Sequence, residues 1–227
     1  MPKKNIREGF GEAAEDYLKA IFTVTERKGE AKTKVIAEHL QVQPASVTSM
    51  LKKLETLGLV SYQPYYGAVL TSAGEKVAVE IIRHHRLLES FLAEALGMSW
   101  ADVHDEAERL EHVISEEFEA RIADYLGHPE RDPHGDPIPD INGAFNDDDG
   151  QPLAQLDVGQ RATIARVKRQ EPDALSYFSD IGLVPGASVA LIRREPMNGP
   201  LTLDIAGTIC VLGSELAADV VISGRSK

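Results

Sequence analysis

The sequence predicts a mainly α-helical protein with a smaller β-rich region, and three observations carry this prediction. Two short helical segments and an alternating stretch succeed one another before residue 73. Two long stretches without proline follow, and residues 153–227 then change to short β-branched segments separated by glycine or proline. We therefore expect a winged helix-turn-helix at 1–73, a helical domain at 74–140, a linker at 141–152 and a small β-barrel at 153–227.

Composition and charge limit the classes of function. The chain has 227 residues and one cysteine, Cys210, so it can form no internal disulfide and no thiolate-rich zinc site, which fits a reducing cytoplasm. The net charge is −12, yet residues 1–75 hold 10 Lys/Arg against 9 Asp/Glu. An acidic protein can still bind DNA through such a near-neutral region. No apolar run suits a signal peptide or a membrane span, so we expect a cytoplasmic protein without membrane contact.

The N-terminal region carries the pattern of a winged helix-turn-helix. Residues 12–27 place apolar side chains at helical spacing, which predicts an amphipathic helix. A helix capped by Thr33 is expected next, and after a tight turn a second one begins at Pro44, whose missing N–H costs nothing in a first turn. The strand-like stretch 59–71 then predicts a hairpin with aromatic residues at its tip.

The second helix of this unit is the candidate DNA-reading element. Its exposed positions are small or polar, so the helix can approach base edges while lysines reach phosphates. The candidate DNA contacts are Thr33, Gln43, Pro44, Ala45, Ser46, Thr48, Ser49, Lys52, Lys53 and Tyr65. An ordinary helical pair with a solvent-facing polar side is the weaker interpretation. Tyr62, Tyr65 and Tyr66 either contact the DNA backbone or pack within the hairpin, and the sequence leaves both open.

A candidate metal site lies in residues 101–126, which contain no Gly or Pro and are expected to form one helix. Two imidazoles and two carboxylates of this helix fall within an arc of roughly 100°, namely His104, Glu108, Glu111 and His112. On the preceding helix, His85 and Glu89 are four residues apart and share a face. Divalent transition metals accept this mixture of nitrogen and oxygen ligands.

The remaining helical surface and the following loop are less specific. The helices expected at 73–96 and 101–126 carry more apolar surface than one small domain needs, which favours a homodimer. Residues 127–155 are dense in Pro, Gly and Asp and predict loop and linker, with the acidic run 147–149 as a solvated tip. His128 and His134 lie in this loop among aspartates. We favour backbone hydrogen bonding for them over a further metal site.

Five motifs resemble the metal-dependent repressors of the diphtheria toxin repressor and manganese transport regulator family. They are AEDYLKAIF, GLV followed by a wing and LTSAG, HHRLLESFL, VHDEAERLEHVIS and HPERDPHGDPIP. The resemblance covers essentially the whole chain, and residues 153–227 look like the SH3-like, FeoA-like domain of the longer members. The last motif departs from the family, because members often have Cys where Asp132 stands.

The resemblance implies two metal positions in the helical metal-binding and dimerisation domain. The primary position maps to Asp16, Glu108, Glu111 and His112. The second maps to His85, Glu89 and His104, with oxygen ligands from the C-terminal domain in long members. Glu171 stands where one such ligand is expected, and Asp173 could substitute for an amide missing at Ala174. Manganese-type members also carry Glu where this chain has Lys19, so their two-metal arrangement cannot be transferred unchanged.

The resemblance implies a repressor that binds palindromic double-stranded operator DNA as a homodimer and controls metal-uptake genes. Iron-type members place Met and Cys where this chain has Asp16 and Glu108, so the hard oxygen ligands favour Mn²⁺ over Fe²⁺. Two rival functions remain open. A dinuclear hydrolase would use the same His and Glu residues, but the chain has no HExxH pattern and is not expected to be an enzyme. A winged-helix regulator of an organic ligand would leave the His/Glu stripe as a solvated helix face.

Overall fold

The computed structural model describes residues 11–146 and 150–226, which fall into two compact units. The first unit comprises Met1–His84, Glu111–Val113 and Pro139–Ala144. The second comprises His85–Leu110, Ile114–Ile138 and Phe145–Lys227. The acidic run expected as a solvated tip, 147–149, lies outside the described residues.

The first unit contains the predicted winged helix-turn-helix. Its elements are α1 (Glu12–Lys28), α2 (Thr33–His39), α3 (Pro44–Thr56), β1 (Val60–Gln63) and β2 (Gly67–Leu70). Leu18, Ile36 and Leu51 are fully buried and bring the three helices onto one core. Thr33 does not cap α2 as predicted. The chain is extended at Lys32, and Thr33 is already the first helical residue.

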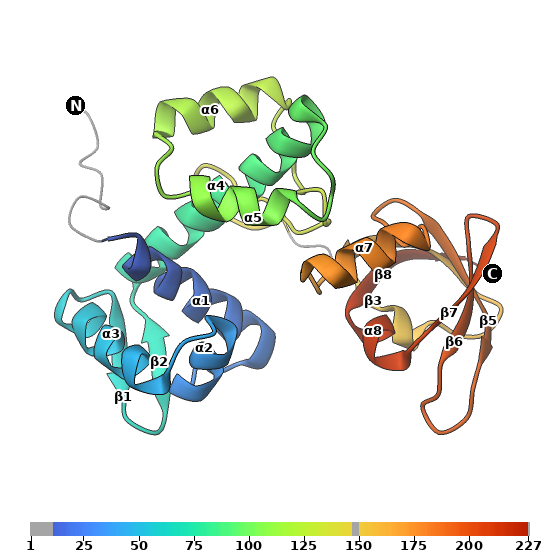
Figure 1. Ribbon diagram of the computed structural model, residues 1–227, viewed down its shortest axis with the longest axis horizontal. Helices are drawn as coiled ribbons and strands as arrows, with labels where there is room; N and C mark the ends of the chain where they lie inside the picture. Colours follow the sequence, from blue (N-terminus) through green and yellow to red (C-terminus); the bar gives the residue numbers. More distant parts are fainter. Residues whose placement is uncertain (1–10, 147–149, 227) are drawn as a thin grey trace. The chain divides into compact units, whose positions relative to one another are not determined.

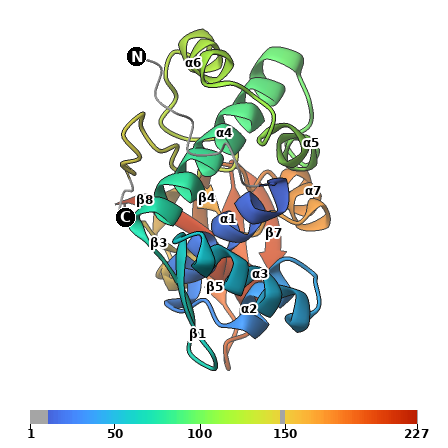
Figure 2. The same ribbon diagram turned by 90° about the vertical axis from the view of Figure 1, so that its left-hand side faces the viewer.

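The β1–β2 hairpin is fixed to the helices at one point of close approach. Gly67 has φ +105, and a Cβ there would lie 2.5 Å from the carbonyl oxygen of Ala31, so only glycine fits. The next residue, Ala68, donates its N–H to the same oxygen at 3.0 Å. In Figure 1 the hairpin projects beyond α2 and α3, and Figure 2 shows it from the side beside the same helices. Its tip therefore stands clear of the helical core.

The long helix α4 (Ser72–Leu96) contributes to both units. It begins where the Thr71 hydroxyl accepts a hydrogen bond from the N–H of Gly74, and it ends at Gly97, whose φ is +67. In the second unit, Leu87 and Leu92 of α4 pack with Val103 and Ile122. Val103 is the first residue of α5 (Val103–Leu110), and Ile122 lies in α6 (Glu116–Tyr125). Among the described helices, none has the length and apolar character of a membrane span.

The C-terminal part of the second unit is a strongly curved antiparallel sheet (Figure 1). Its strands are β3 (Gln151–Pro152), β4 (Arg161–Val167), β5 (Ser188–Arg194), β6 (Leu201–Ile205), β7 (Thr208–Leu212) and β8 (Val220–Ser226), in the order β3-β8-β4-β5-β6-β7. The short helices are η1 (Leu153–Gln155), α7 (Pro172–Asp180) and α8 (Ser214–Ala218). This confirms the SH3-like fold. Closure into a barrel was wrong, because within the described residues no ladder joins β3 to β7.

The loop after α6 runs against strand β4. Val167 donates its N–H to the carbonyl oxygen of His134 at 2.9 Å. Gly135 has φ +87, and a Cβ there would lie 2.1 Å from the carbonyl oxygen of Ala165, so the loop can approach β4 only with glycine at this position. Trp100 packs on the core of the sheet and donates its indole N–H to the carbonyl oxygen of Pro133. The loop is thus an ordered part of the second unit.

Candidate metal centre

The stretch predicted as one helix, 101–126, is two helices separated by a turn. Helix α5 ends at Leu110 and α6 begins at Glu116, where the hydroxyl of Ser115 accepts the N–H of Phe118 and caps it. Glu111 and His112 lie in the turn. The prediction of four ligands on one helical stripe was therefore wrong. A local cap at Ser115 competes with continuing the helix, and the turn frees Glu111 and His112 from the face of α5.

The turn brings Glu111 and His112 to Asp16 of helix α1. One ligand atom from each of these residues lies within 4.8 Å of the others, and we call Asp16, Glu111 and His112 the first cluster. The Nε2 atom of His112 is 2.8 Å from Asp16 Oδ1 and 3.5 Å from Glu111 Oε1. On the other side of the ring, Nδ1 is 2.7 Å from Glu15 Oε2. Glu15 therefore orients the imidazole so that Nε2 faces the two carboxylates.

The first cluster is strongly acidic, and its imidazole responds to that charge. Burial lowers the pKa of His112, but hydrogen bonds to Asp16 and Glu15 and the charge of Glu111 outweigh burial and raise this pKa to about 10. Lys19 lies one turn after Asp16, and its Nζ is 2.9 and 2.8 Å from the two oxygens of Glu111. Carboxylate and imidazole donors at these separations suit a divalent cation that accepts oxygen and nitrogen.

A second cluster lies wholly in the second unit and consists of His85, His104 and Glu108. Nε2 of His85 is 3.1 Å from Nδ1 of His104, and Oε1 of Glu89 is 2.9 and 3.0 Å from these same atoms. Glu108 lies 3.9 Å from Nε2 of His104. The expected grouping of His85, Glu89 and His104 is thus present. Glu108, predicted for the primary position, is grouped here with the histidines.

A third set of donors, which we call the buried group, comprises Glu89, Asp132 and His134. Glu89 and His134 are at most 1% exposed, and Nδ1 of His134 lies 3.4 Å from Oε2 of Glu89. The predicted backbone hydrogen bond of His134 is confirmed, because its Nε2 is 3.0 Å from the carbonyl oxygen of Trp100. The sequence did not predict that His134 would also meet Glu89. His128 is exposed and pairs with Asp124 at 3.2 Å.

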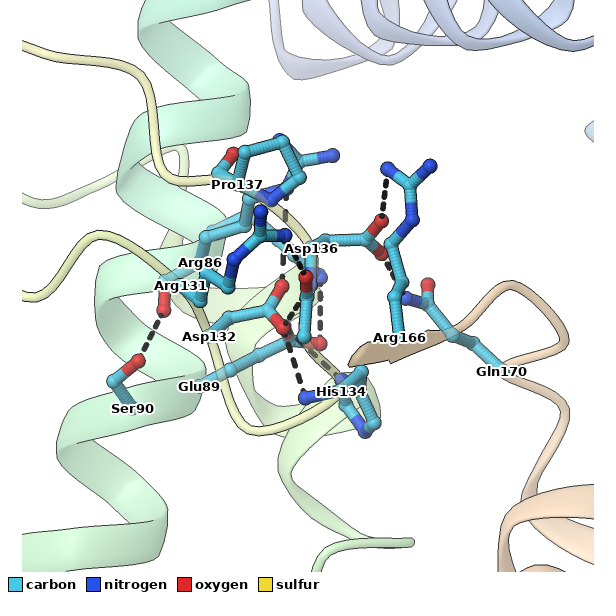
Figure 3. A network of polar contacts seen from close by, with 12 residues as sticks. Arg86, Glu89, Ser90, Arg131, Asp132, His134, Asp136, Pro137, Arg166 and Gln170 are labelled. Atoms are coloured by element: carbon cyan, nitrogen blue, oxygen red, sulfur yellow. Dashed lines mark hydrogen bonds and ion pairs between the residues drawn. The ribbon is translucent and has the colours of Figure 1, made fainter. Parts of the chain in front are cut away.

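The buried group belongs to a wider polar network (Figure 3). Oδ1 of Asp132 accepts the backbone N–H groups of His134 and Asp136, while Oδ2 faces Arg86 at 3.8 Å. Three of its atoms, Glu89 Oε2, Asp132 Oδ2 and His134 Nδ1, are buried without a hydrogen bond. Burial, together with the charges of Glu89 and Asp136, raises the pKa of Asp132 well above its usual range. In contrast, the surrounding histidines outweigh burial and hold the pKa of Glu89 well below its usual range.

Asp136 connects this network to the sheet. Its Oδ1 lies 3.4 Å from Arg166 of β4, and its Oδ2 accepts a hydrogen bond from Gln170 at 2.6 Å (Figure 3). Glu171 and Asp173, the ligands expected from the C-terminal domain, are exposed at the start of α7. Neither belongs to any of the three donor groups found in the described residues. The structure therefore does not bring these two carboxylates to a candidate metal site.

The candidate DNA contacts lie on the outer side of the winged domain. Val47, Leu51 and Leu54 turn one face of α3 into the core, which leaves its opposite face in solvent. On or just before that face lie Gln43, Pro44, Ala45, Ser46, Ser49, Lys52 and Lys53, all exposed. Thr33 and Thr48 are half-buried, and the Thr48 hydroxyl donates to the carbonyl oxygen of Pro44. At the hairpin tip Tyr65 is 96% exposed with φ +73, so it does not pack within the hairpin.

Three family models match successive regions of the chain. The model described as "Iron dependent repressor, N-terminal DNA binding domain" matches residues 9–68. The model described as "Iron dependent repressor, metal binding and dimerisation domain" matches residues 71–140, and a FeoA domain model matches residues 151–223. Residues 9–68 and 71–140 therefore match two domains of one kind of regulator, and residues 151–223 match a FeoA domain.

Individual relatives and solved structures agree with these matches. The iron-dependent repressor IdeR of Mycobacterium tuberculosis is 30% identical over 208 residues, 86% of this chain and 90% of that protein. The regulator MntR of Oceanobacillus iheyensis is 40% identical over 114 residues, 50% of this chain and 77% of that protein. A manganese-dependent transcriptional repressor in complex with manganese superposes with a TM-score of 0.86 at 36% identity, covering 93% of this chain and 99% of the other. IdeR of T. acidophilum superposes with a TM-score of 0.77 at 27% identity, covering 92% and 96%.

A winged DNA-binding domain joined to clustered nitrogen and oxygen donors defines a metal-dependent transcriptional repressor. The chain belongs to the iron-dependent repressor family, to which the diphtheria toxin repressor also belongs. Members are DNA-binding regulators and not enzymes, which disfavours the hydrolase interpretation. The named relatives include both iron-dependent and manganese-dependent repressors.

Proposed function

We propose that this protein is a manganese-responsive repressor of metal-uptake genes that binds palindromic double-stranded operator DNA as a homodimer. One observation carries the choice of metal: the first cluster offers oxygen from Asp16 and Glu111 and nitrogen from His112, and no sulfur. Mn²⁺ has little need of soft ligands. In this proposal, residues 1–73 bind DNA, residues 74–140 bind metal and form the dimer, residues 141–152 are a linker, and residues 153–227 form the SH3-like domain. The protein is proposed to act in the cytoplasm.

The candidate primary ligands are Asp16, Glu111 and His112, to which the family resemblance adds Glu108. The candidate second position consists of His85, Glu89 and His104. A bound divalent ion supplies positive charge that lowers the repulsion between neighbouring carboxylates. Asp16 lies on α1 of the winged domain and His112 lies in the turn before α6, so each presents its ligand atom to the same point. Glu15 accepts a hydrogen bond from Nδ1 of the imidazole and so holds Nε2 toward that point.

Operator recognition is proposed for α3 and the hairpin. The exposed hydroxyl and amide groups of α3 can reach base edges, and Lys52 and Lys53 can reach phosphates. Ordering of α1 against the turn biases two winged domains of a homodimer toward the spacing of two half-sites. A shift of a few kcal/mol suffices for a large change in operator occupancy.

Fluorescence anisotropy on a palindromic promoter fragment of a metal-uptake gene tests this proposal, with Mn²⁺ and anaerobic Fe²⁺ titrated separately at physiological salt. Tightening at micromolar Mn²⁺, with Fe²⁺ effective only at far higher concentration, supports a manganese sensor. The alternative is an iron(II)-responsive repressor, which the name of the mycobacterial relative favours. An equal or stronger response to Fe²⁺ would establish that alternative. No response to either ion would instead favour a regulator that binds an organic ligand.

A further inference from the structure

Lys19 makes a contact that none of the candidate ligand assignments includes. It lies on α1, one turn after Asp16, and its ammonium is 2.9 and 2.8 Å from the two carboxylate oxygens of Glu111. The side chain of Glu111 is 0% exposed and that of Lys19 is 16% exposed. The ammonium thus occupies both oxygens of a buried carboxylate, where solvent screens the pairing weakly.

Lys19 cannot itself be a metal ligand, because an ammonium has three donors and no lone pair. It nevertheless sits on the same oxygens that Glu111 would offer to a cation. A divalent ion on Glu111 must either replace the ammonium at one oxygen or share the carboxylate with it. In both cases a positive charge remains beside the ion, and like charges at such distances repel strongly in a partly buried site.

The same contact stabilises the protein when no ion is bound. Glu15, Asp16 and Glu111 place three carboxylates within reach of the single imidazole of His112. A buried carboxylate without a counter-charge is costly, and Lys19 supplies such a charge to Glu111. Lys19 therefore stabilises the ion-free cluster through the interaction that opposes a bound ion.

We propose that Lys19 is an internal competitor for the divalent ion at Glu111 and sets the metal affinity of the first cluster. This inference rests on the proposed function of that cluster. Replacing Lys19 is expected to change two quantities in opposite directions. The ion-free protein becomes less stable to heat, and the affinity of the first cluster for Mn²⁺ rises by about tenfold to 100-fold, the range in which groups next to the ligands alter metal affinity. If the role of Lys19 were merely structural, its replacement would lower both the thermal stability and the Mn²⁺ affinity.

The test uses the full chain and isothermal titration calorimetry with Mn²⁺, together with thermal unfolding in a metal chelator. His112→Ala identifies the binding event of the first cluster as the one that disappears. Lys19→Met then removes the charge at similar side-chain length, and Lys19→Gln removes it but keeps a hydrogen-bond donor. The test needs only one of these two variants to fold. Lys19→Arg keeps a cation that can contact both oxygens of Glu111, so its Mn²⁺ affinity should stay close to that of the unmodified protein. Lys28→Met, at an exposed position of the same helix, is the matched control.

Tighter binding in Lys19→Met or Lys19→Gln, accompanied by a lower melting temperature, supports the inference. Unchanged or weaker binding in both variants overturns it while leaving the metal site intact. If the unmodified protein has no binding event that His112→Ala removes, the proposed metal site itself fails, and the role of Lys19 fails with it. The two failures are distinguishable. Failure of the role of Lys19 shows only in the Mn²⁺ affinity of the Lys19 variants, whereas failure of the metal site already shows in the unmodified protein.

Discussion

The first cluster and the buried group contain similar donors but balance their charges differently. In the first cluster, each of Asp16, Glu111 and His112 has a charged partner within 3 Å. In the buried group, Oε1 of Glu89 also has close partners, at 2.9 Å from His85 and 3.0 Å from His104. The other contacts of the group are longer: 3.4 Å between His134 and Glu89, and 3.8 Å between Arg86 and Asp132. Three of its polar atoms have no hydrogen bond.

Two sets of His, Asp and Glu residues with similar members can therefore differ in how their charges are paired, and this pairing decides what each set can do. Paired charges in the first cluster, which solvent reaches at Asp16, can exchange a partner for a ligand at modest cost. Charges that are buried and held by backbone N–H groups contribute to the integrity of the second unit as well. We therefore expect substitutions in the first cluster to alter metal response, and substitutions in the buried group to alter folding.

The largest expected effect is that of Glu89→Ala. Glu89 faces His85, His104 and His134 at once, and its removal leaves buried imidazoles without their anion. Loss of one partner from a buried charged set typically costs about 3–5 kcal/mol of unfolding free energy. Urea unfolding followed by circular dichroism measures this change. Glu94→Ala, at an exposed position of the same helix, should stay within about 0.5 kcal/mol. A loss below 1 kcal/mol for Glu89→Ala would remove the contrast between the two regions.

Asp16→Ala is expected to leave the fold intact and to abolish metal-stimulated DNA binding. The side chain of Asp16 is 38% exposed, so its loss creates no buried cavity. Loss of a ligand should weaken Mn²⁺ binding by at least about 100-fold, the upper end of what groups next to the ligands contribute. Operator binding by anisotropy, with and without Mn²⁺, measures the effect. Unchanged metal dependence would sink the assignment of Asp16 to the site.

Asp136→Ala tests whether the network beyond the buried group stabilises the second unit. The variant loses contacts to Arg166 and Gln170, and hydrogen bonds of charged groups contribute about 1.5–3 kcal/mol. We expect about 1.5 kcal/mol of destabilisation and faster proteolysis in the loop at 127–138, because the carboxylate is not wholly buried. Glu195→Ala, which breaks a more exposed pair with Arg193, should cost less than about 0.5 kcal/mol. Equal effects of the two substitutions would contradict a structural role for the network.

The smallest expected effect is that of a single pH unit on the Mn²⁺ affinity of the first cluster. His112 must lose its Nε2 proton to bind metal, and the pKa of His112 is raised to about 10. Between pH 6 and 8 each bound ion therefore releases a proton, and the affinity should rise by about tenfold per pH unit. Without metal the sign is opposite: pairing of the charged ring stabilises the fold fully below about pH 6.5 and is lost as pH rises through about 10. Calorimetry in buffers of different ionisation enthalpy measures the released proton, and a pH-independent affinity would contradict the assignment.

The sequence by itself determined the fold class and the residue types of the candidate donor groups. Local signals sufficed for this: apolar spacing in α1, proline at the start of α3, and short β-branched segments in the C-terminal region. His85 and Glu89 could be paired because one turn of helix separates them. These relations depend on neighbours within a few residues, which the sequence displays directly.

Only the tertiary structure decided how the donors are divided. The break between α5 and α6 moves Glu111 and His112 from one helical face to a turn beside α1, while Glu108 stays with His104. Lys19 meets Glu111 across 92 positions of sequence, and His134 meets Glu89 from a loop without periodicity. Such contacts depend on where the chain turns and which backbones can approach closely. Helical periodicity carries no information on either, because it describes a residue's direction within one element and not its distance from another.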